Sequence, residues 1–353
     1  MRGLQTRTEI LQQPDLWPDT VERARDCKFR TRLEQGPVFL TGAGTSAHAA
    51  TAIEAAWPLT HGYEARAIPS TDLLIDCDSP FAQGGALLSL ARSGDSPESL
   101  GVIDRVQRSH SQVRHFAITC NPSGGLANRL GENALVLDPR TNDRSLAMTS
   151  SFSNLVLAGL CIKNLDALRN NVSRIADGVS KSLREMEETA EMVSRGDPDR
   201  AVVLASRPLA GAAQEACLKM LEMTAGRVVA ISETFLGLRH GPMSFLRSGT
   251  LVLCWLSNDP LRRRYEEDLL AELRAKKLGR IVCIATPLAG PEIADIAIAA
   301  SAPTLPDPLR TPFEIVFAQL LAYHMSLRAG LDPDSPSPDG VITRVVRGVR
   351  MHA

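Results

Sequence analysis

The sequence predicts an α/β protein with two doubly wound parallel-sheet domains and connecting helices. Short β-rich apolar runs alternate with helical patterns, which is typical of a parallel sheet covered on both faces. A strandless region with helical apolar spacing, 152–195, interrupts this alternation, which then begins again. The length of 353 residues agrees, since ~150 residues per domain gives about two domains.

The first half opens with a helical segment over 1–30 and continues with a first domain, including linking helices, over 31–195. A strand at 37–41 leads into a small-residue loop, 42–46, and then into an Ala-rich helix that runs to Trp57. Further buried strands are predicted at 65–68, 86–90, 115–120 and 134–137.

The second half repeats this order, and we place a second domain at 196–330. A strand at 201–205 is followed by a short loop and an Ala-rich helix, 210–223. Val38 and Val202 stand at equivalent places in the two first strands, which indicates a weak internal duplication. Such sheets bind ligands beyond the carboxyl ends of their strands. The remaining strands are predicted at 227–231, 250–256 and 280–285.

The C-terminal tail, 331–353, begins with the sequence LDPDSPSPDG at 331–340, which is typical of a loose linker. Apolar residues follow this linker, so we expect the end of the chain to dock back near the active site. These residues are Val341, Ile342, Val345 and Val346.

The composition excludes several function classes. The chain has 39 Lys and Arg residues and 40 Asp and Glu residues, so its formal net charge is −1. It therefore lacks the basic excess of a general nucleic-acid binder. Aromatic residues make up 4%, which disfavours a base-stacking platform. The N-terminus has no apolar signal region, and the longest apolar run, 155–162, is far short of a membrane span. We therefore expect a cytoplasmic protein without a membrane partner.

The seven cysteines are scattered, and at least Cys120, Cys254 and Cys283 lie in apolar runs. This pattern predicts buried reduced thiols and no disulfide framework. No group of His, Cys and carboxylate residues has the spacing of metal ligands, so we expect no metal site.

The first loop, GAGTSA at 42–47, follows a predicted strand and opens a helix. It matches a relaxed dinucleotide-binding fingerprint, but no acidic residue closes the second strand, although Asp72 lies just beyond it. The alternative is an anion site, because the hydroxyls of Thr45 and Ser46 lie beside free amides of a helix N-terminus.

A second loop, RSGDSPES at 92–99, follows the strand at 86–90. Ser96 and Pro97 suit the N-cap and the first helical position, so helix capping alone explains them. The functional alternative is a phosphate held by Ser93, Ser96 and backbone amides. A third hydroxyl cluster, 149–151, begins the next helix and extends the same candidate pocket.

The helix at 210–223 carries the sharpest signal. Glu215, Lys219 and Glu222 stand at i, i+4 and i+7 and therefore share one face. One interpretation is a solvated face with a Glu–Lys pair, and the other is a general base beside an ammonium group. The other face is expected to be apolar, with Ala213, Ala216, Cys217, Met220 and Leu221.

His240 stands in the loop sequence LRHGP. A lone loop histidine is usually exposed or hydrogen-bonded. The following Gly241 and Pro242 instead suit a positioned side chain, and histidine transfers protons at neutral pH.

Together these segments resemble the SIS (sugar isomerase) domain family, in particular the bacterial galactosamine-6-phosphate deaminase/isomerase group, also called tagatose-6-phosphate ketose/aldose isomerases. The resemblance runs over nearly the whole chain and extends to the isomerase half of glucosamine-6-phosphate synthase. The segments that carry it are GAGTSA (42–47), ARSGDSPES (91–99), AMTSSFSN (147–154), EACLKMLEMTAG (215–226), ETFLGLRHGP (233–242) and DSPSPDGVITRVV (334–346).

The resemblance implies flavodoxin-like SIS domains, no cofactor, and a homodimer or larger assembly with shared active sites. It implies that Glu222 moves the C1/C2 proton, that His240 assists ring opening, and that Lys219 and Glu215 support them. The implied substrate-binding residues are Gly44, Thr45, Ser46, Ser93, Gly94, Ser96, Thr149, Ser150, Glu215 and Arg344.

Two departures separate the chain from the synthase. Ala91 replaces a serine of the synthase's phosphate loop, and the synthase's C-terminal lysine has no match, Arg344 being the nearest cation. The missing lysine argues against a Schiff-base step and against the synthetic direction.

Three functions from different classes remain open at this point. The first is an amino-sugar-phosphate deaminase/isomerase that converts galactosamine 6-phosphate to tagatose 6-phosphate and ammonia, with glucosamine 6-phosphate deamination or plain aldose/ketose isomerisation as alternatives. The second is a phosphosugar-binding regulator without activity. The third is a Rossmann-type dehydrogenase, which NAD(P) binding to the loop at 42–47 would reveal.

Overall fold

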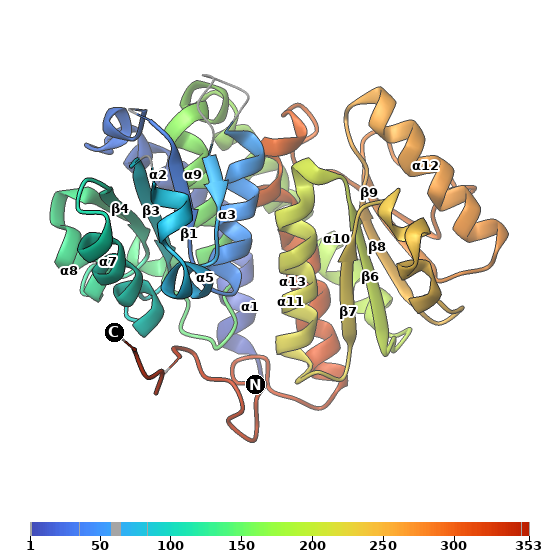
Figure 1. Cartoon of the computed structure of the whole chain (residues 1–353). Helices are drawn as coiled ribbons and strands as arrows, with labels where there is room; N and C mark the ends of the chain where they lie inside the picture. Colours follow the sequence, from blue (N-terminus) through green and yellow to red (C-terminus); the bar gives the residue numbers. More distant parts are fainter. Residues whose placement is uncertain (1, 35, 58–64, 83, 347, 353) are drawn as a thin grey trace. The chain divides into compact units, whose positions relative to one another are not determined.

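The structure is a computed structural model that describes residues 2–34, 36–57, 65–82, 84–346 and 348–352. The chain packs into two compact units. We call them the N-terminal unit (Thr8–Asp177 with Asp339–Ala353) and the C-terminal unit (Met1–Arg7 with Gly178–Pro338). Each unit holds a five-stranded, all-parallel sheet covered by helices (Figure 1). The predicted α/β class is therefore confirmed.

The sheet of the N-terminal unit has the strand order β2-β1-β3-β4-β5. The predicted strands of the first half are all present, with each end within one residue of its predicted position. In register, Leu40 of β1 lies beside Leu88 of β3, which lies beside Phe116 of β4. The strands are β1 (Val38–Thr41), β2 (Ala65–Ala67), β3 (Ala86–Ala91), β4 (Arg114–Thr119) and β5 (Ala134–Val136).

Helices cover both faces of this sheet because successive strand residues point to opposite sides. Phe39 and Leu87 pack with residues of α5 and α7 on one face. Helices α3 and α9 contact the strands from the other face, and α2 packs on α9. The helices of this part of the chain are α2 (Gln13–Arg25), α3 (Thr45–Ala56), α5 (Ser70–Ile75), α6 (Asp78–Phe81), α7 (Pro97–Ser109), α8 (Gly125–Leu130) and α9 (Ser150–Arg169).

The sheet of the C-terminal unit has the order β10-β9-β8-β6-β7. Counted from the first strand of each unit, both sheets follow the order 2-1-3-4-5, as the predicted duplication requires. The edge strand β10, in which the Ile residues are half-buried and the Ala residues exposed, was not predicted. The strands are β6 (Arg200–Ala205), β7 (Val229–Glu233), β8 (Leu251–Trp255), β9 (Arg280–Ala285) and β10 (Ile296–Ala299).

The helices of the C-terminal unit also lie on two faces. Residues of α12 pack on Val252 and Cys254, while α11 and α13 pack on each other and α11 contacts β6 and β7. Asp259 caps α12, accepting hydrogen bonds from the amides of Leu261 and Arg262 at 3.1 and 2.9 Å. The helices are α11 (Ala210–Met223), α12 (Pro260–Ala275) and α13 (Thr311–Arg328), with α1 (Leu4–Leu11) and α10 (Val172–Ser194) completing the chain.

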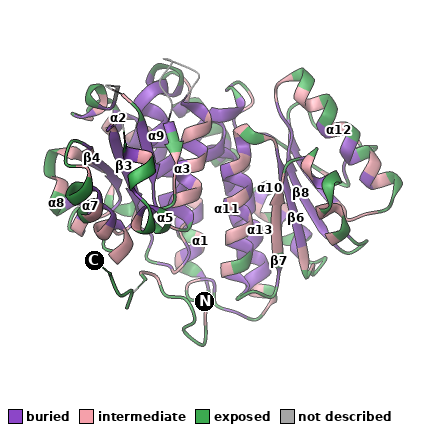
Figure 2. Ribbon diagram, in the orientation of Figure 1, coloured by how far each residue is buried: buried purple, intermediate pink, exposed green. Residues whose placement is uncertain are grey.

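The central strands of both sheets are buried, and exposed residues lie on the outer faces of the helices and in loops (Figure 2). All seven cysteines are free thiols in the structure, and all are buried except Cys27 and Cys217, which are half-buried. Leu221 was expected on the apolar face of its helix, but its residue is 46% exposed. In the described part of the chain, no helix combines the length and the apolar character needed to cross a membrane.

Candidate active site

A pocket of about 120 Å³ opens at the carboxyl end of the N-terminal sheet. The strand order places a topological switch between β1 and β3, because the helices that follow these strands lie on opposite faces. Ligands of such sheets bind in the crevice at this switch. The polar lining comes from the loops after both strands and from the tail: Ser46, Arg92, Ser93, Ser96, Glu98, Ser99 and Arg344.

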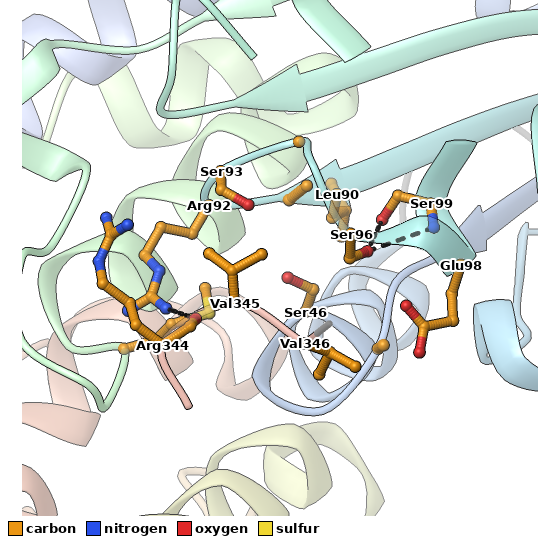
Figure 3. A pocket seen from close by; sticks show the side chains of 14 residues that line it. Ser46, Leu90, Arg92, Ser93, Ser96, Glu98, Ser99, Arg344, Val345 and Val346 are labelled. Atoms are coloured by element: carbon orange, nitrogen blue, oxygen red, sulfur yellow. Dashed lines mark hydrogen bonds between the residues drawn. The ribbon is translucent and has the colours of Figure 1, made fainter. Parts of the chain in front are cut away.

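Serine hydroxyls surround this pocket (Figure 3). Ser96 is the N-cap of α7 and accepts a hydrogen bond from the amide of Ser99 at 3.3 Å. Its hydroxyl also lies 2.7 Å from that of Ser99. Ser93 Oγ accepts the amide of Asp95 at 3.2 Å. The capping interpretation of this loop is therefore confirmed, and the same serines also line the pocket.

Backbone geometry brings the predicted glycines and hydroxyls together. Gly44 and Gly94 have φ of +55° and +71°, a region that favours glycine. Thr45 and Ser46 begin α3 and are 4% and 5% exposed. Ser46 and Gly94 line the pocket, whereas Thr45 is buried next to Ser46.

Arg92 was not predicted to belong to the site. Its residue is 6% exposed, and its guanidinium donates to the carbonyls of Ser145 and Leu146, both at 3.1 Å, and to the carbonyl of Arg344. The buried cation adds positive charge to the pocket wall, which favours an anion there. The sequence offered no signal, since a single arginine in a loop is normally exposed.

Asp143 organises the loop below the pocket. Its buried carboxylate accepts the amides of Thr149 and Ser151 at 2.7 and 2.9 Å, and the hydroxyls of Ser150 and Ser151. Thr149 and Ser150 were predicted to bind substrate, but they are fully buried at this carboxylate. They hold the loop in place and are not part of the pocket lining.

Arg344 joins the last part of the tail to the rest of the N-terminal unit. Its Nε donates to the carbonyl of Asp143 at 2.8 Å and its Nη2 to Asn142 Oδ1 at 2.8 Å. Val345 and Val346 line the pocket with it. Val341, which we expected to pack against the body, is instead 84% exposed.

Glu98 places a carboxylate at the pocket, in the first turn of α7. Its Oε2 is buried and has no hydrogen-bond partner among the described residues. The helix N-terminus favours this negative charge, but the charge also opposes the binding of an anion.

The C-terminal unit holds a buried charge network on α11. Lys219 Nζ lies 3.3 Å from Glu215 Oε1 and donates to Glu222 Oε2. The side chains of Glu215 and Lys219 are fully buried, so the interpretation of this face as solvated is wrong. Burial lowers the pKa of the Lys219 ammonium, but the charges of Glu215 and Glu222 outweigh burial and raise the pKa overall.

Within this network, only Glu222 reaches solvent, with 22% of its side chain exposed. The three groups together carry a net charge of −1, since two carboxylates face one ammonium. A carboxylate at the surface of a buried pair can exchange a proton with a bound molecule. His240 is exposed and ends the 3₁₀ turn Gly237–His240, a different element from α11.

The equivalent crevice of the second sheet is filled by the protein itself. Glu266 of α12 accepts the hydroxyl of Ser206, after β6, and the amide of Ser257, after β8, at 2.7 Å. Glu266 is 1% exposed, and burial raises its pKa. A carboxylate therefore occupies the place in the second sheet where the first sheet has its pocket.

One sequence expectation needs correction. No group of His, Cys and carboxylate residues had metal-ligand spacing along the chain, yet the fold brings Cys77, Asp78 and His110 together. Cys77 and Asp78 are adjacent in sequence, but His110 comes from the far end of α7. Linear spacing does not show such a cluster.

Comparison with known proteins gives full-length similarities. The chain is 35% identical over 376 residues to the D-galactosamine-6-phosphate deaminase AgaS of Escherichia coli, covering 99% of this chain and 96% of that protein. It is 34% identical to the same-named protein of Shewanella sp. strain ANA-3, covering 98% and 91%. The crystal structure of tagatose-6-phosphate ketose/aldose isomerase from Escherichia coli superposes with a TM-score of 0.86 at 31% identity, covering 99% and 97%. A scan of protein-family profiles finds no match.

Proposed function

Because this chain belongs to the SIS (sugar isomerase) domain family of phosphosugar isomerases and deaminases, we propose that it converts galactosamine 6-phosphate and water to tagatose 6-phosphate and ammonia. The observation that carries this proposal is the α11 network, in which a buried ammonium holds a partly exposed carboxylate. Proton transfer at a sugar carbon needs such a positioned base. The names of the AgaS relatives support the choice of substrate.

We assign phosphate binding to the serine-lined pocket of the N-terminal unit. Ser46, Ser93 and Ser96 supply hydroxyl donors there, and the N-termini of α3 and α7 supply a favourable dipole. Arg92 adds a buried positive charge. Hydrogen bonds to a charged group contribute ~1.5–3 kcal/mol each, enough for a few donors to retain a sugar phosphate.

We assign proton transfer to Glu222 and ring opening to His240. Lys219 orients the Glu222 carboxylate through their ion pair, while Glu215 balances the buried ammonium. The net charge of −1 on this network suits a substrate that carries an ammonium at C2, because opposite charges attract.

The proposed steps balance without a cofactor. His240 transfers protons between the anomeric hydroxyl and the ring oxygen, which opens the sugar to its aldehyde. Glu222 removes the C2 proton while the aldehyde oxygen takes a proton from the C2 ammonium, which gives a neutral enolamine with a hydroxyl at C1. Glu222 then returns its proton at C1, so the enolamine becomes a C2 iminium. Water adds to the iminium carbon, the C–N bond breaks, and ammonia leaves with tagatose 6-phosphate as the ketose product.

An ammonia-release assay tests the proposal on the full chain. Galactosamine 6-phosphate, glucosamine 6-phosphate and their N-acetyl forms are compared as substrates, and the galacto-configured amine is expected to react fastest. Glu222→Gln is expected to lower kcat by about 10²–10⁴-fold, the usual contribution of a general base. Glu185→Gln is the matched control, because Glu185 is exposed on α10 and should leave kcat unchanged.

Binding is tested separately. Ser93→Ala should raise KM by about 10-fold or more with a smaller effect on kcat, whereas Ser109→Ala, at the exposed end of α7, should change neither. Equal loss of kcat in both glutamate variants, or a KM that Ser93→Ala leaves unchanged, contradicts the assigned roles.

A second candidate is plain aldose/ketose isomerisation, which the similarity to tagatose-6-phosphate ketose/aldose isomerase favours. Interconversion of aldose and ketose phosphates without ammonia release would identify it. Substrate binding without any conversion would instead identify a sugar-phosphate sensor. We also propose a homodimer or larger assembly, which light scattering of the purified chain measures.

A further inference from the structure

A thiol, a carboxylate and an imidazole meet at one corner of the N-terminal unit, away from the serine-lined pocket. Cys77 is the residue before α6, Asp78 begins α6, and His110 follows the last residue of α7. Asp78 Oδ1 lies 3.1 Å from His110 Nε2 and 3.9 Å from Cys77 Sγ. All three ligand atoms lie within 4.8 Å of one another.

We propose that Cys77, Asp78 and His110 bind a zinc ion. Zinc bonds of ~2.3 Å to sulfur and ~2.0–2.2 Å to nitrogen and oxygen, at tetrahedral angles, give ligand separations of about 3.4 Å for N···O and about 3.6 Å for S···O. The corresponding distances here, 3.1 and 3.9 Å, each differ from these values by about 0.3 Å. The separation of sulfur and imidazole nitrogen, which is within 4.8 Å, must also reach about 3.6 Å, and side-chain rotation has to supply this change.

The donor set selects zinc among common divalent ions. Thiolate and imidazole favour zinc over magnesium or calcium, which prefer all-oxygen sites. On binding, the Cys77 thiol loses its proton to solvent and the thiolate coordinates the metal, while the imidazole coordinates through neutral Nε2. Three protein ligands leave a fourth position for water, as in open zinc sites.

The surroundings combine a dry side and an open side. Cys77 is fully buried in an apolar cluster with Phe81, Val106 and Val113, which shields the sulfur from water. The Asp78 side chain is 76% exposed and offers the ion a route from solvent.

The two elements that carry the ligands are also tied together. The amide of His110 donates to the carbonyl of Val106 at 2.7 Å, and the amide of Val113 donates to the carbonyl of His110 at 2.9 Å. Arg105 of α7 donates to the carbonyl of Ile75, two residues before Cys77, at 3.3 Å. The backbone therefore presents the ligands without a change of fold.

The test measures metal binding by the full chain and does not depend on activity. Protein freed of metal by a chelator is titrated with Zn²⁺ in competition with a chromophoric chelator, and separately with Co²⁺ as a spectroscopic probe. We expect one tight equivalent of Zn²⁺ per chain and, with Co²⁺, the sulfur-to-metal charge-transfer band of a thiolate ligand. Cys77→Ser, Asp78→Asn and His110→Gln should each weaken Zn²⁺ binding by more than about 10-fold.

Two matched variants serve as controls. Cys27→Ser changes a half-buried thiol and Asp72→Asn an exposed carboxylate outside the cluster, and both should bind Zn²⁺ as the wild type does. If Cys77→Ser fails to fold by circular dichroism, the surface variant Asp78→Asn and His110→Gln decide the question. Absence of a tight equivalent, or binding that survives in the folded cluster variants, overturns the proposal. The proposal is also overturned if Cys77→Ser retains the charge-transfer band with Co²⁺, even when His110→Gln loses metal binding.

Discussion

His115 should make the N-terminal unit less stable in mild acid. The residue lies near the start of β4, beside Leu87 of β3, and both ring nitrogens are buried without a hydrogen-bond partner among the described residues. Burial, helped by the positive charge of Arg129, lowers the pKa of His115 from 6.5 to about 4. The folded protein therefore holds this imidazole neutral at pH values where the unfolded chain protonates it.

The sign and size of the effect follow from linkage. Between about pH 6.5 and about pH 4 the unfolded state binds more protons, so stability falls as the pH decreases through this window and the loss is complete below about pH 4. With these two pKa values, the free energy of unfolding falls by about 2 kcal/mol when the pH decreases from about 8 to about 5. Because the ring is partly exposed, solvent screening reduces this, and we expect ~1–2 kcal/mol.

His115→Leu should remove this pH dependence. Leucine keeps the buried volume and deletes two polar atoms that lack partners, so the variant should equal or exceed the wild type in stability at about pH 8. Urea unfolding is followed by the fluorescence of Trp17 and Trp57, both in the N-terminal unit, in a Trp255→Phe background that silences the C-terminal unit.

Two outcomes decide this prediction. The difference in unfolding free energy between His115→Leu and the parent should grow by ~1–2 kcal/mol from about pH 8 to about pH 5. The variant His352→Gln, which changes an exposed histidine of the tail, should follow the parent at every pH. A parallel pH dependence for His115→Leu and the parent would refute the assignment of the acid loss to this ring.

Three further changes test the charges described above. Lys219→Met should lower the free energy of unfolding by about 3–5 kcal/mol, and with it the calorimetric melting temperature, because it removes the ammonium that contacts the buried Glu215 carboxylate. Adding Glu215→Gln should recover part of that loss. Glu266→Ala should empty the crevice of the second sheet. Added acetate should therefore raise the melting temperature of this variant and leave that of the wild type unchanged. An equal response of the two proteins would contradict the view that Glu266 fills a ligand crevice. Glu98→Gln should bind inorganic phosphate about fivefold more tightly in calorimetric titrations, since it removes about 1 kcal/mol of repulsion, and weaker binding would show that the carboxylate does not face the anion.

Much of the fold could be predicted from local patterns. Strands β1 and β3 are short, fully buried runs of mostly apolar residues, bounded by glycine, proline and polar residues, so their positions can be read from the local sequence. β10 was not predicted, because half of its residues are alanine, a residue type that is depleted in strands. Ser96 was correctly predicted as a cap, since the signal lies in the sequence SPES itself.

Long-range contacts limited the prediction of the candidate sites. Helical spacing showed that Glu215, Lys219 and Glu222 share a face, but it left open whether water or protein covers that face. Arg92 and Asp143 were missed because burial of a charge depends on carbonyls and amides supplied by distant segments. The same limit hid the approach of His110 to Cys77 and Asp78.

The sequence by itself determined where strands and helices form, which loops carry hydroxyls at helix N-termini, and that the two halves share one plan. These properties depend on residues that are neighbours along the chain or along one helix. The tertiary structure alone decided which charges lose contact with water, and that one sheet keeps an open pocket where the other inserts Glu266. Burial and pairing are properties of packed surfaces, so they arise only when segments far apart in the chain come into contact.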